Sequence, residues 1–316
     1  MKKIIILLIS VFAFAITTLK PYKFYRYSYY ISKVAYNKDY LIIGLENGKI
    51  LINNFKTNKN ITKIILPKIT NAMGDLISMP IYSLDISPNG KNLMIMVEGE
   101  NAIRKIFIYN FKTKKMRLIY TTKRLLMKAR YTNKNNIFLG LLGDEIELLN
   151  IKNKKIAYKK QIGYYVFSTY ALNKTRTKAV IGDESGVAKV VDIKNGKKLF
   201  DLKGYNKNQT ISLDFVKNYI INGSSDKRLA IYNTISKTSI LTLTAKFLPY
   251  AVAISPNLKE FAFQYDQNND IMVKTINNQP LFLLKGHSMP LINIRFLNNN
   301  KIISYSAGEI IIWKLK

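Results

Sequence analysis

Residues 167–202 read FSTYALNKTRTKAVIGDESGVAKVVDIKNGKKLFDL, and this stretch contains one complete structural unit. Four short runs in it are rich in β-branched, aromatic and other apolar residues, a composition that favours strands. The runs are 167–172, 178–181, 187–191 and 198–202. Turn residues separate them, with Asp183 to Gly186 before the third run and Asn195-Gly196 before the fourth. Because such turns join neighbouring antiparallel strands, the stretch predicts a four-stranded antiparallel sheet.

The third run of this unit closes on Val191-Asp192, and similar closing pairs recur along the chain. The seven pairs are Asn53-Asn54, Tyr109-Asn110, Leu149-Asn150, Val191-Asp192, Tyr232-Asn233, Lys274-Thr275 and Trp313-Lys314, at intervals of 56, 40, 42, 41, 42 and 39 residues. A period of about 40 residues built from strands is typical of β-propellers. The sequence therefore predicts an all-β, seven-bladed β-propeller. Its units are 31–66, 81–120, 125–160, 166–203, 210–245, 249–284 and 291–316.

The last unit ends just after its third strand, at residues 313–316, so its blade is one strand short. A tyrosine-rich segment over 22–30 belongs to no unit, and Tyr25, Tyr27 and Tyr29 would share one side of a strand there. We predict that this N-terminal segment completes the last blade, which would remove two free sheet edges and close the ring. The alternative is an aromatic binding patch, because exposed tyrosines also suit interfaces.

The first fifteen residues have the pattern of an export signal. Lys2 and Lys3 precede an apolar run over 4–14, and Ala13-Phe14-Ala15 supplies a small-x-small cleavage pattern. The run is shorter than the roughly 20 residues that a membrane-spanning helix needs. We therefore expect a signal peptide over 1–15, a mature domain over 16–316, export to the periplasm and no transmembrane span. An uncleaved N-terminal anchor is the alternative.

The chain is strongly basic and contains no cysteine. Its formal net charge is +31, yet arginine, whose planar fork suits phosphate and base recognition, accounts for only eight of the 50 basic residues. A nucleic-acid partner is therefore not expected. The lysines reflect either a compositional bias or a functional basic face, and the sequence leaves both interpretations open. Without cysteine the chain has no disulfides and no thiolate ligands for metal or haem.

The seventh unit contains a distinctive set of side chains. Gly286-His287 precedes its first strand, Ser304 ends the second and Trp313 ends the third. These residues resemble the WD40-repeat family, in which Gly-His and Trp-Asp pairs bracket each repeat. The resemblance covers nearly all of the chain in spacing, although no unit has the complete set. It implies that His287, Ser304 and Trp313 form part of a buried hydrogen-bonded network, which lacks its acidic member because Ala307-Gly308 replaces it.

The sequence offers little material for catalysis. One histidine and no cysteine exclude the ligand sets of copper and haem propellers, so no metal or cofactor is expected. A glycosidase needs two carboxylates that face one cavity, whereas Asp85, Asp214 and the Asp144-Glu145 pair lie in separate units. We interpret these carboxylates as structural, predict no catalytic residue and expect that the chain is not an enzyme.

The longest interval, of 56 residues, marks an insertion over 67–80 between the first two units. Insertions in repeat proteins collect on the binding face, and methionines suit adaptable apolar contacts. The candidate partner-binding residues are Pro67, Met73, Leu76, Met79 and Pro80. The alternative is a tolerated loop that packs on its own blade.

Taken together, these features predict a non-catalytic, monomeric propeller that binds protein partners. Its size, export signal, repeat number and lysine- and asparagine-rich composition are similar to those of NapL-like accessory propellers of the periplasmic nitrate reductase system. This resemblance implies a scaffold or assembly role, with subunits of a periplasmic redox complex as partners. Two alternatives stay open. A propeller hydrolase would need acidic residues that converge at the channel mouth, and an envelope assembly factor is favoured if positive charge segregates to one face.

Overall fold

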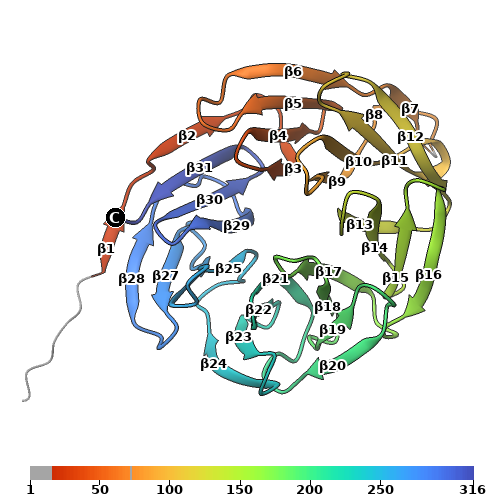
Figure 1. Ribbon diagram of the computed structural model, residues 1–316. Coiled ribbons are helices and arrows are strands. Elements are labelled where there is room, and N and C mark those ends of the chain that lie inside the picture. The colour runs from red at the N-terminus through yellow and green to blue at the C-terminus, as the bar shows by residue number, and fades with distance from the viewer. Residues whose placement is uncertain (1–15, 72) are drawn as a thin grey trace, which may run out of the picture.

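The computed structural model describes residues 16–71 and 73–316, so the predicted signal peptide and its cleavage pattern lie outside the described residues. Seven antiparallel sheets surround a central channel as the blades of a propeller (Figure 1). The first strand of each blade lies next to the channel and the last lies at the rim. The predicted all-β, seven-bladed β-propeller is confirmed.

The strands follow the predicted units. Blade 1 comprises β3 (Ile31–Tyr36), β4 (Tyr40–Leu45), β5 (Lys49–Asn54) and β6 (Asn60–Ile65). Blade 2 comprises β9 (Ile81–Ile86), β10 (Asn92–Glu98), β11 (Arg104–Asn110) and β12 (Met116–Thr122). Blade 3 comprises β13 (Leu126–Tyr131), β14 (Asn136–Leu141), β15 (Glu145–Asn150) and β16 (Lys155–Gln161). Blades 4 and 5 comprise β17 (Phe167–Leu172), β18 (Lys178–Asp183), β19 (Ala188–Asp192) and β20 (Lys198–Leu202), then β21 (Thr210–Val216), β22 (Tyr219–Ser224), β23 (Arg228–Asn233) and β24 (Thr238–Thr244). Blade 6 contains β25 (Val252–Ile254), β26 (Glu260–Gln264), β27 (Ile271–Thr275) and β28 (Pro280–Leu284), and blade 7 contains β29 (Leu291–Asn298), β30 (Lys301–Ser306) and β31 (Glu309–Lys314).

The hydrophobic core lies between neighbouring blades. The second strand of a blade is buried on both sides, as in β4, where Ile42 and Ile43 are fully buried. Successive side chains of a strand point to opposite sides, so Ile42 packs with residues of blade 2 while Ile43 packs with residues of blade 7. Each blade is therefore stabilised by both of its neighbours, which makes closure of the ring important for stability.

β2 (Lys23–Arg26) pairs antiparallel with β31 and supplies the fourth strand of blade 7. Tyr25 and Tyr27 pack against the core that blades 7 and 1 share. The predicted completion of the last blade by the N-terminal segment is confirmed, and we call β2 the closing strand. It is shorter than expected, because the strand ends at Arg26 and Tyr29 beyond it is 51% exposed.

A second N-terminal strand was not predicted. β1 (Thr17–Leu19) pairs parallel with β28 and gives blade 6 a fifth strand. The amide of Lys285 also donates a hydrogen bond to the carbonyl of Leu19 at 3.1 Å. Figure 1 shows β1 at the rim of blade 6 and β2 at the rim of blade 7, so the start of the described chain joins the last two blades.

The antiparallel order of the strands gives the ring two faces with different loops. The turns after the first and third strands of each blade form one face, which we call the turn face. The turns after the second strands and the blade-to-blade connections form the other, which we call the connection face. The insertion forms a hairpin of β7 (Lys68–Thr70) and β8 (Leu76–Ser78) between blades 1 and 2, and it therefore belongs to the connection face. Within residues 16–71 and 73–316 there is one short 3₁₀ helix, η1 (Glu100–Ala102), which follows β10 on the same face.

Candidate functional site

The insertion hairpin presents apolar side chains at its tip. The side-chain oxygen of Asn71 accepts hydrogen bonds of 2.9 Å from the amides of both Met73 and Asp75, which holds the turn. Met73 is 89% exposed and Leu76 is 64% exposed. The hairpin also packs on the propeller through the buried side chain of Ile69. It therefore combines an anchored base with an apolar tip that is open to solvent.

One member of the predicted partner-binding set was wrong. Met79 is only 3% exposed, because it lies between β8 and β9 and its side chain enters the core between blades 1 and 2. Pro67 is exposed and Pro80 is half-buried at the two ends of the insertion. Within the insertion, the surface that a partner could contact is thus the hairpin tip and its flanks.

Other blade-to-blade connections carry exposed apolar residues as well. Most prominent is Tyr164, which is 94% exposed, followed in sequence by the exposed Tyr165 and Val166. Further exposed side chains on these connections, or at the strand start beside them, are Tyr29, Tyr30, Leu125, Tyr250 and Ile292. Among the described turns of the opposite face, only Ile235, at 72%, is a comparably exposed large hydrophobic residue. Of the two faces, the connection face therefore carries most of the exposed apolar surface, while further exposed apolar residues lie on the outer strands.

The turn face carries the opposite character. The turns after the third strands of blades 1 to 5 hold ten exposed lysines and no acidic residue; these turns are 55–59, 111–115, 151–154, 193–197 and 234–237. The turns after the first strands add six exposed lysines and a single acidic residue, Asp39. A compositional bias toward lysine would not by itself explain why these turns contain almost no acidic residues. The larger excess of positive charge therefore lies on the turn face, which is the arrangement expected of the alternative function, an envelope assembly factor.

A buried network links His287, Ser304 and Trp313. The indole Nε1 of Trp313 donates to Ser304 Oγ at 2.8 Å, and Ser304 Oγ lies 2.7 Å from His287 Nε2. Burial lowers the pKa of His287, so its imidazole is neutral at pH 7 and its Nε2 accepts a hydrogen bond from the hydroxyl of Ser304. The histidine is thus occupied as a structural hydrogen-bonding residue inside blade 7.

The expectation that this network lacks an acid was wrong. Glu309, one residue beyond Ala307-Gly308, is 1% exposed and places Oε2 at 3.4 Å from His287 Nδ1. It also accepts hydrogen bonds from the amide and hydroxyl of Ser288 and pairs with Arg26 of the closing strand at 3.2 Å. The resemblance to WD40 repeats placed the acidic residue at Ala307-Gly308. The acid instead comes from Glu309, the first residue of β31, which the short turn before that strand brings next to His287.

Acid is expected to destabilise the protein through Glu309. The hydrogen bond with His287, opposed by burial and aided by Ser288 and Arg26, lowers the pKa of Glu309 from 4.5 to about 2. The unfolded chain therefore binds a proton first, and the stability that Glu309 contributes is present above pH 4.5 and lost as the pH falls toward 2. In urea unfolding, the free energy of unfolding should fall over this window by about 3 kcal/mol more than in Glu309→Gln. Parallel pH curves for the two proteins would contradict this assignment.

Asp85 and Asp214 occupy equivalent places on the first strands of blades 2 and 5. The carboxylate of Asp85 accepts a 2.8 Å hydrogen bond from the amide of Tyr131 in blade 3, and Asp214 accepts one of 3.0 Å from the amide of Ile254 in blade 6. Each also binds an arginine two blades further on, namely Arg176 for Asp85 and Arg295 for Asp214. Both carboxylates therefore hold successive blades together, which supports the structural interpretation of these residues over a hydrolytic one.

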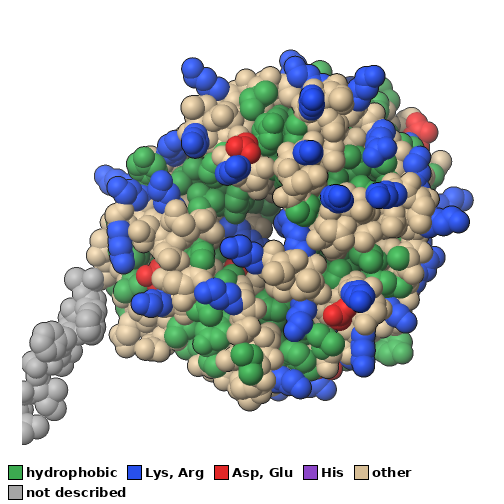
Figure 2. Space-filling model, viewed as in Figure 1, with side chains coloured by type: hydrophobic (Ala, Val, Ile, Leu, Met, Phe, Trp, Pro, Cys, Tyr) green, Lys and Arg blue, Asp and Glu red, His purple; other side chains and the backbone are tan. Residues whose placement is uncertain are grey.

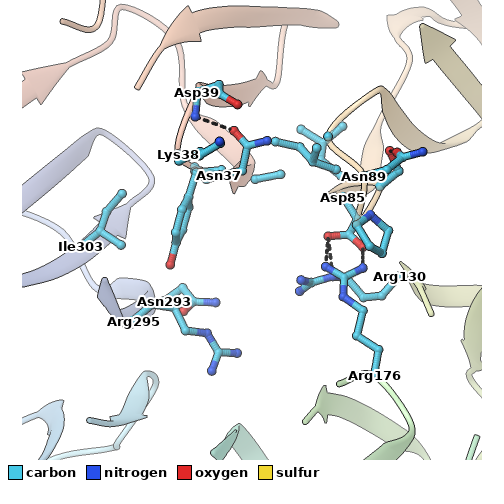
Figure 3. Close-up of a pocket in the computed structure, with 18 of the residues that line it drawn as sticks. Asn37, Lys38, Asp39, Asp85, Asn89, Arg130, Arg176, Asn293, Arg295 and Ile303 are labelled. Carbon is cyan, nitrogen blue, oxygen red and sulfur yellow. Dashed lines mark hydrogen bonds and ion pairs between the residues drawn. The ribbon is translucent and has the colours of Figure 1, made fainter. Parts of the chain in front are cut away.

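The central channel brings together basic residues that sequence reasoning had left scattered. A cavity of about 690 Å³ opens on the turn face, and one of about 390 Å³ lies toward the connection face. Arg130, Arg295, Asn293 and Tyr305 line both. Figure 3 shows Arg130 and Arg176 beside Asp85 on one side of the larger cavity and Arg295 on the opposite side. Lys and Arg side chains also border the central opening in Figure 2.

Comparison with known proteins places this geometry in a fold family. No family model matches the sequence. Over 140 residues the chain is 23% identical to the E3 ubiquitin-protein ligase COP1 of Arabidopsis thaliana, a match that covers 42% of this chain and only 21% of that protein. The structure aligns with a chain in the crystal structure of a mitotic checkpoint complex with a TM-score of 0.76 at 12% identity, over 93% of this chain and 91% of the other. The fold is that of a WD40-like, seven-bladed β-propeller.

The predicted Asp144-Glu145 pair is part of the framework of this WD40-like propeller. The buried carboxylate of Asp144 lies 3.0 Å from Lys189 Nζ, which also contacts the buried Asp183, so blades 3 and 4 are joined by one lysine between two acids. Burial raises the pKa of Asp144. Glu145 pairs with Arg124. In the described residues no group of three or more potential metal ligands is found, and no helix there has the length and apolar character needed to cross a membrane.

The sequence contains a pattern that indicates the basic residues of the channel. Lys33, Lys128, Arg130 and Arg295 all lie within first strands, which line the channel in every blade. Strands packed against a neighbouring blade tolerate charge poorly, so charged residues inside innermost strands indicate a water-filled channel. Aligning the first strands of the seven units would have placed these cations in one ring.

Proposed function

We propose that this propeller is a non-catalytic scaffold of the periplasm that binds a protein partner through its connection face. The observation that supports it is the concentration of exposed aromatic and aliphatic residues on that face, led by Tyr164, Tyr165 and Met73. Burial of exposed tyrosines contributes strongly to protein–protein binding, because these side chains bury large areas with few rotatable bonds. The anchored hairpin extends this apolar surface at one blade junction.

We further propose that the partner belongs to a redox enzyme system such as the periplasmic nitrate reductase, whose assembly the scaffold assists. A single buried histidine and the absence of cysteine leave the chain without a redox ligand set of its own, which favours an accessory role. The resemblance in size, signal and composition to the accessory propellers of that system is the second support.

Affinity capture from a periplasmic extract tests both parts of this proposal. The bait is a protein that begins at Ile16, compared with a Tyr164→Ser/Tyr165→Ser variant and with Ile235→Ser, a matched apolar-to-serine change on the turn face. We expect nitrate reductase subunits in the capture, recovered at least about tenfold less by the double variant, since a lost aromatic anchor typically costs about 2 kcal/mol or more. The Ile235→Ser bait should recover as much as the unaltered protein.

The outcomes separate the two parts. Envelope assembly proteins that are captured in place of the reductase, and lost with the double variant, would retain the scaffold and refute the redox role. Equal recovery of every specific partner by the double variant and the unaltered protein would refute binding through the connection face.

A further inference from the structure

The larger channel cavity has unsatisfied donors for an anion. The Nε of Arg130 lies 2.9 Å from Asp85, but in the described part of the chain no recorded hydrogen bond uses its two terminal nitrogens. Arg295 contacts Asp214 through one terminal nitrogen only. Both guanidinium groups are part-exposed in the cavity, and Figure 3 shows them reaching into it from opposite sides. Each is therefore anchored by one contact and has further N–H groups directed at the open space.

The channel also has more positive than negative charge. The two cavities are lined by two acidic side chains, Asp39 and Asp85, and by six cationic ones, namely Lys33, Lys38, Lys128, Arg130, Arg176 and Arg295. Asp85 and Asp214 neutralise part of this charge through the ion pairs described above. Burial, together with repulsion from Arg130, Arg295 and Lys33, lowers the pKa of Lys128 well below its ordinary value. Like charges held together in this way repel one another, and a bound anion would offset that repulsion.

The surroundings of the cavity favour the same kind of ligand. The cavity opens on the lysine-rich turn face, whose field would raise the local concentration of anions at the channel mouth. A volume of about 690 Å³ lies within the range of small-molecule sites. Asn293 and the hydroxyl groups of Tyr36 and Tyr305 line it and could donate further hydrogen bonds.

We propose that the channel mouth on the turn face binds a small polyanion with two or more phosphate groups, held between Arg130 and Arg295 with Arg176 beside them. The planar guanidinium fork matches the oxygen spacing of a phosphate, and two forks on opposite sides of one cavity suit a ligand with more than one such group. The phosphate groups can belong to a soluble phosphorylated compound or to a phospholipid headgroup. This site lies on the opposite face from the proposed protein-binding surface and does not depend on it.

Isothermal titration with sodium tripolyphosphate tests the site in a protein that begins at Ile16. We expect binding that Arg130→Gln weakens at least tenfold. Lys38→Gln, at a residue that lines the larger cavity and has no recorded side-chain hydrogen bond or ion pair among the described residues, should weaken it several-fold without removing a partner of Asp85. The matched control is Lys237→Gln, which removes the same charge from the exposed turn face and should change the affinity less than twofold. A rise of the melting temperature with tripolyphosphate provides a second measurement if Arg130→Gln folds poorly.

Vesicles of equal parts phosphatidylglycerol and phosphatidylcholine distinguish the two sources of phosphate. Sedimentation of the protein with these vesicles, reversed by tripolyphosphate and reduced in Lys38→Gln, would assign the site to a lipid headgroup. Tripolyphosphate binding without sedimentation would assign it to a soluble compound. The proposal is refuted if tripolyphosphate binds no more tightly than chloride, or if Lys237→Gln weakens binding as much as Lys38→Gln. Binding of a polyglutamate peptide but not of tripolyphosphate would refute it equally.

Discussion

A protein that begins at Ser28, and so lacks β1 and the closing strand, is expected to unfold at a much lower urea concentration than one that begins at Ile16. The truncation removes the half-buried Tyr25 and Tyr27 from the core between blades 7 and 1, and it leaves β31 with a free edge. At about 1 kcal/mol for each of the two tyrosines and for each of about four strand-pairing hydrogen bonds, the loss is roughly 6 kcal/mol. Domains are typically stable by only about 5–15 kcal/mol, so much of the protein would be unfolded under mild conditions.

Trp313 makes this truncation easy to follow. It is the only tryptophan of the sequence, it is fully buried, and it lies in β31 beside the closing strand. Its fluorescence should shift to longer wavelength as β31 becomes exposed. The control is a protein that begins at Lys20, which lacks β1 alone and should lose less than about half as much stability because β1 covers only the rim of blade 6. An unchanged urea midpoint for the protein that begins at Ser28 would contradict the role of the closing strand.

Trp313→Ala is expected to lower the free energy of unfolding by about 3–5 kcal/mol, the usual cost of removing a fully buried large aromatic side chain. The side chain packs in the core shared by blades 6 and 7 and donates to Ser304. Trp313→Phe should cost less, about 1–3 kcal/mol, because it keeps most of the packing but leaves Ser304 without its indole donor. Far-ultraviolet circular dichroism in urea measures both variants, since neither has a tryptophan to report.

The matched comparison for this substitution is Ile235→Ala on the turn face, where the side chain is exposed and the expected change is within about 0.5 kcal/mol. If Trp313→Ala cost less than about 1 kcal/mol, neither the core of blade 7 nor its buried network would be important for stability. If Trp313→Phe cost as much as Trp313→Ala, the hydrogen bonds of the network would account for the whole effect, and packing for none of it.

Much of the fold could be predicted because its signals are local. Asn195-Gly196 indicates a hairpin wherever it occurs between two strands, and the recurrence of such turns at a steady interval is visible without knowledge of any contact. The closing strand also followed from counting, since the last unit had no residues left for a fourth strand. β1 escaped prediction because three residues paired at a rim leave almost no pattern in the sequence.

The residues of the candidate sites, in contrast, depend mostly on contacts that are not local in the sequence. Met73 and Met79 look equivalent in the sequence, and only packing against blades 1 and 2 makes the first exposed and the second buried. Glu309 could not be assigned to the network by position, because a turn of two residues decides which side chain reaches His287. Asp85 and Arg176 are 91 residues apart, and nothing local relates them.

The sequence by itself therefore determined the period, the number of blades and the need for an N-terminal strand, because these depend on alternation and turn chemistry within short segments. Only the tertiary structure decided where charge and apolar surface collect. Closing seven sheets into a ring places the first strand of every blade on one channel and sends alternate loops to opposite faces. Basic residues from distant units thereby become neighbours in the channel, and exposed tyrosines from separate connections come to share one face.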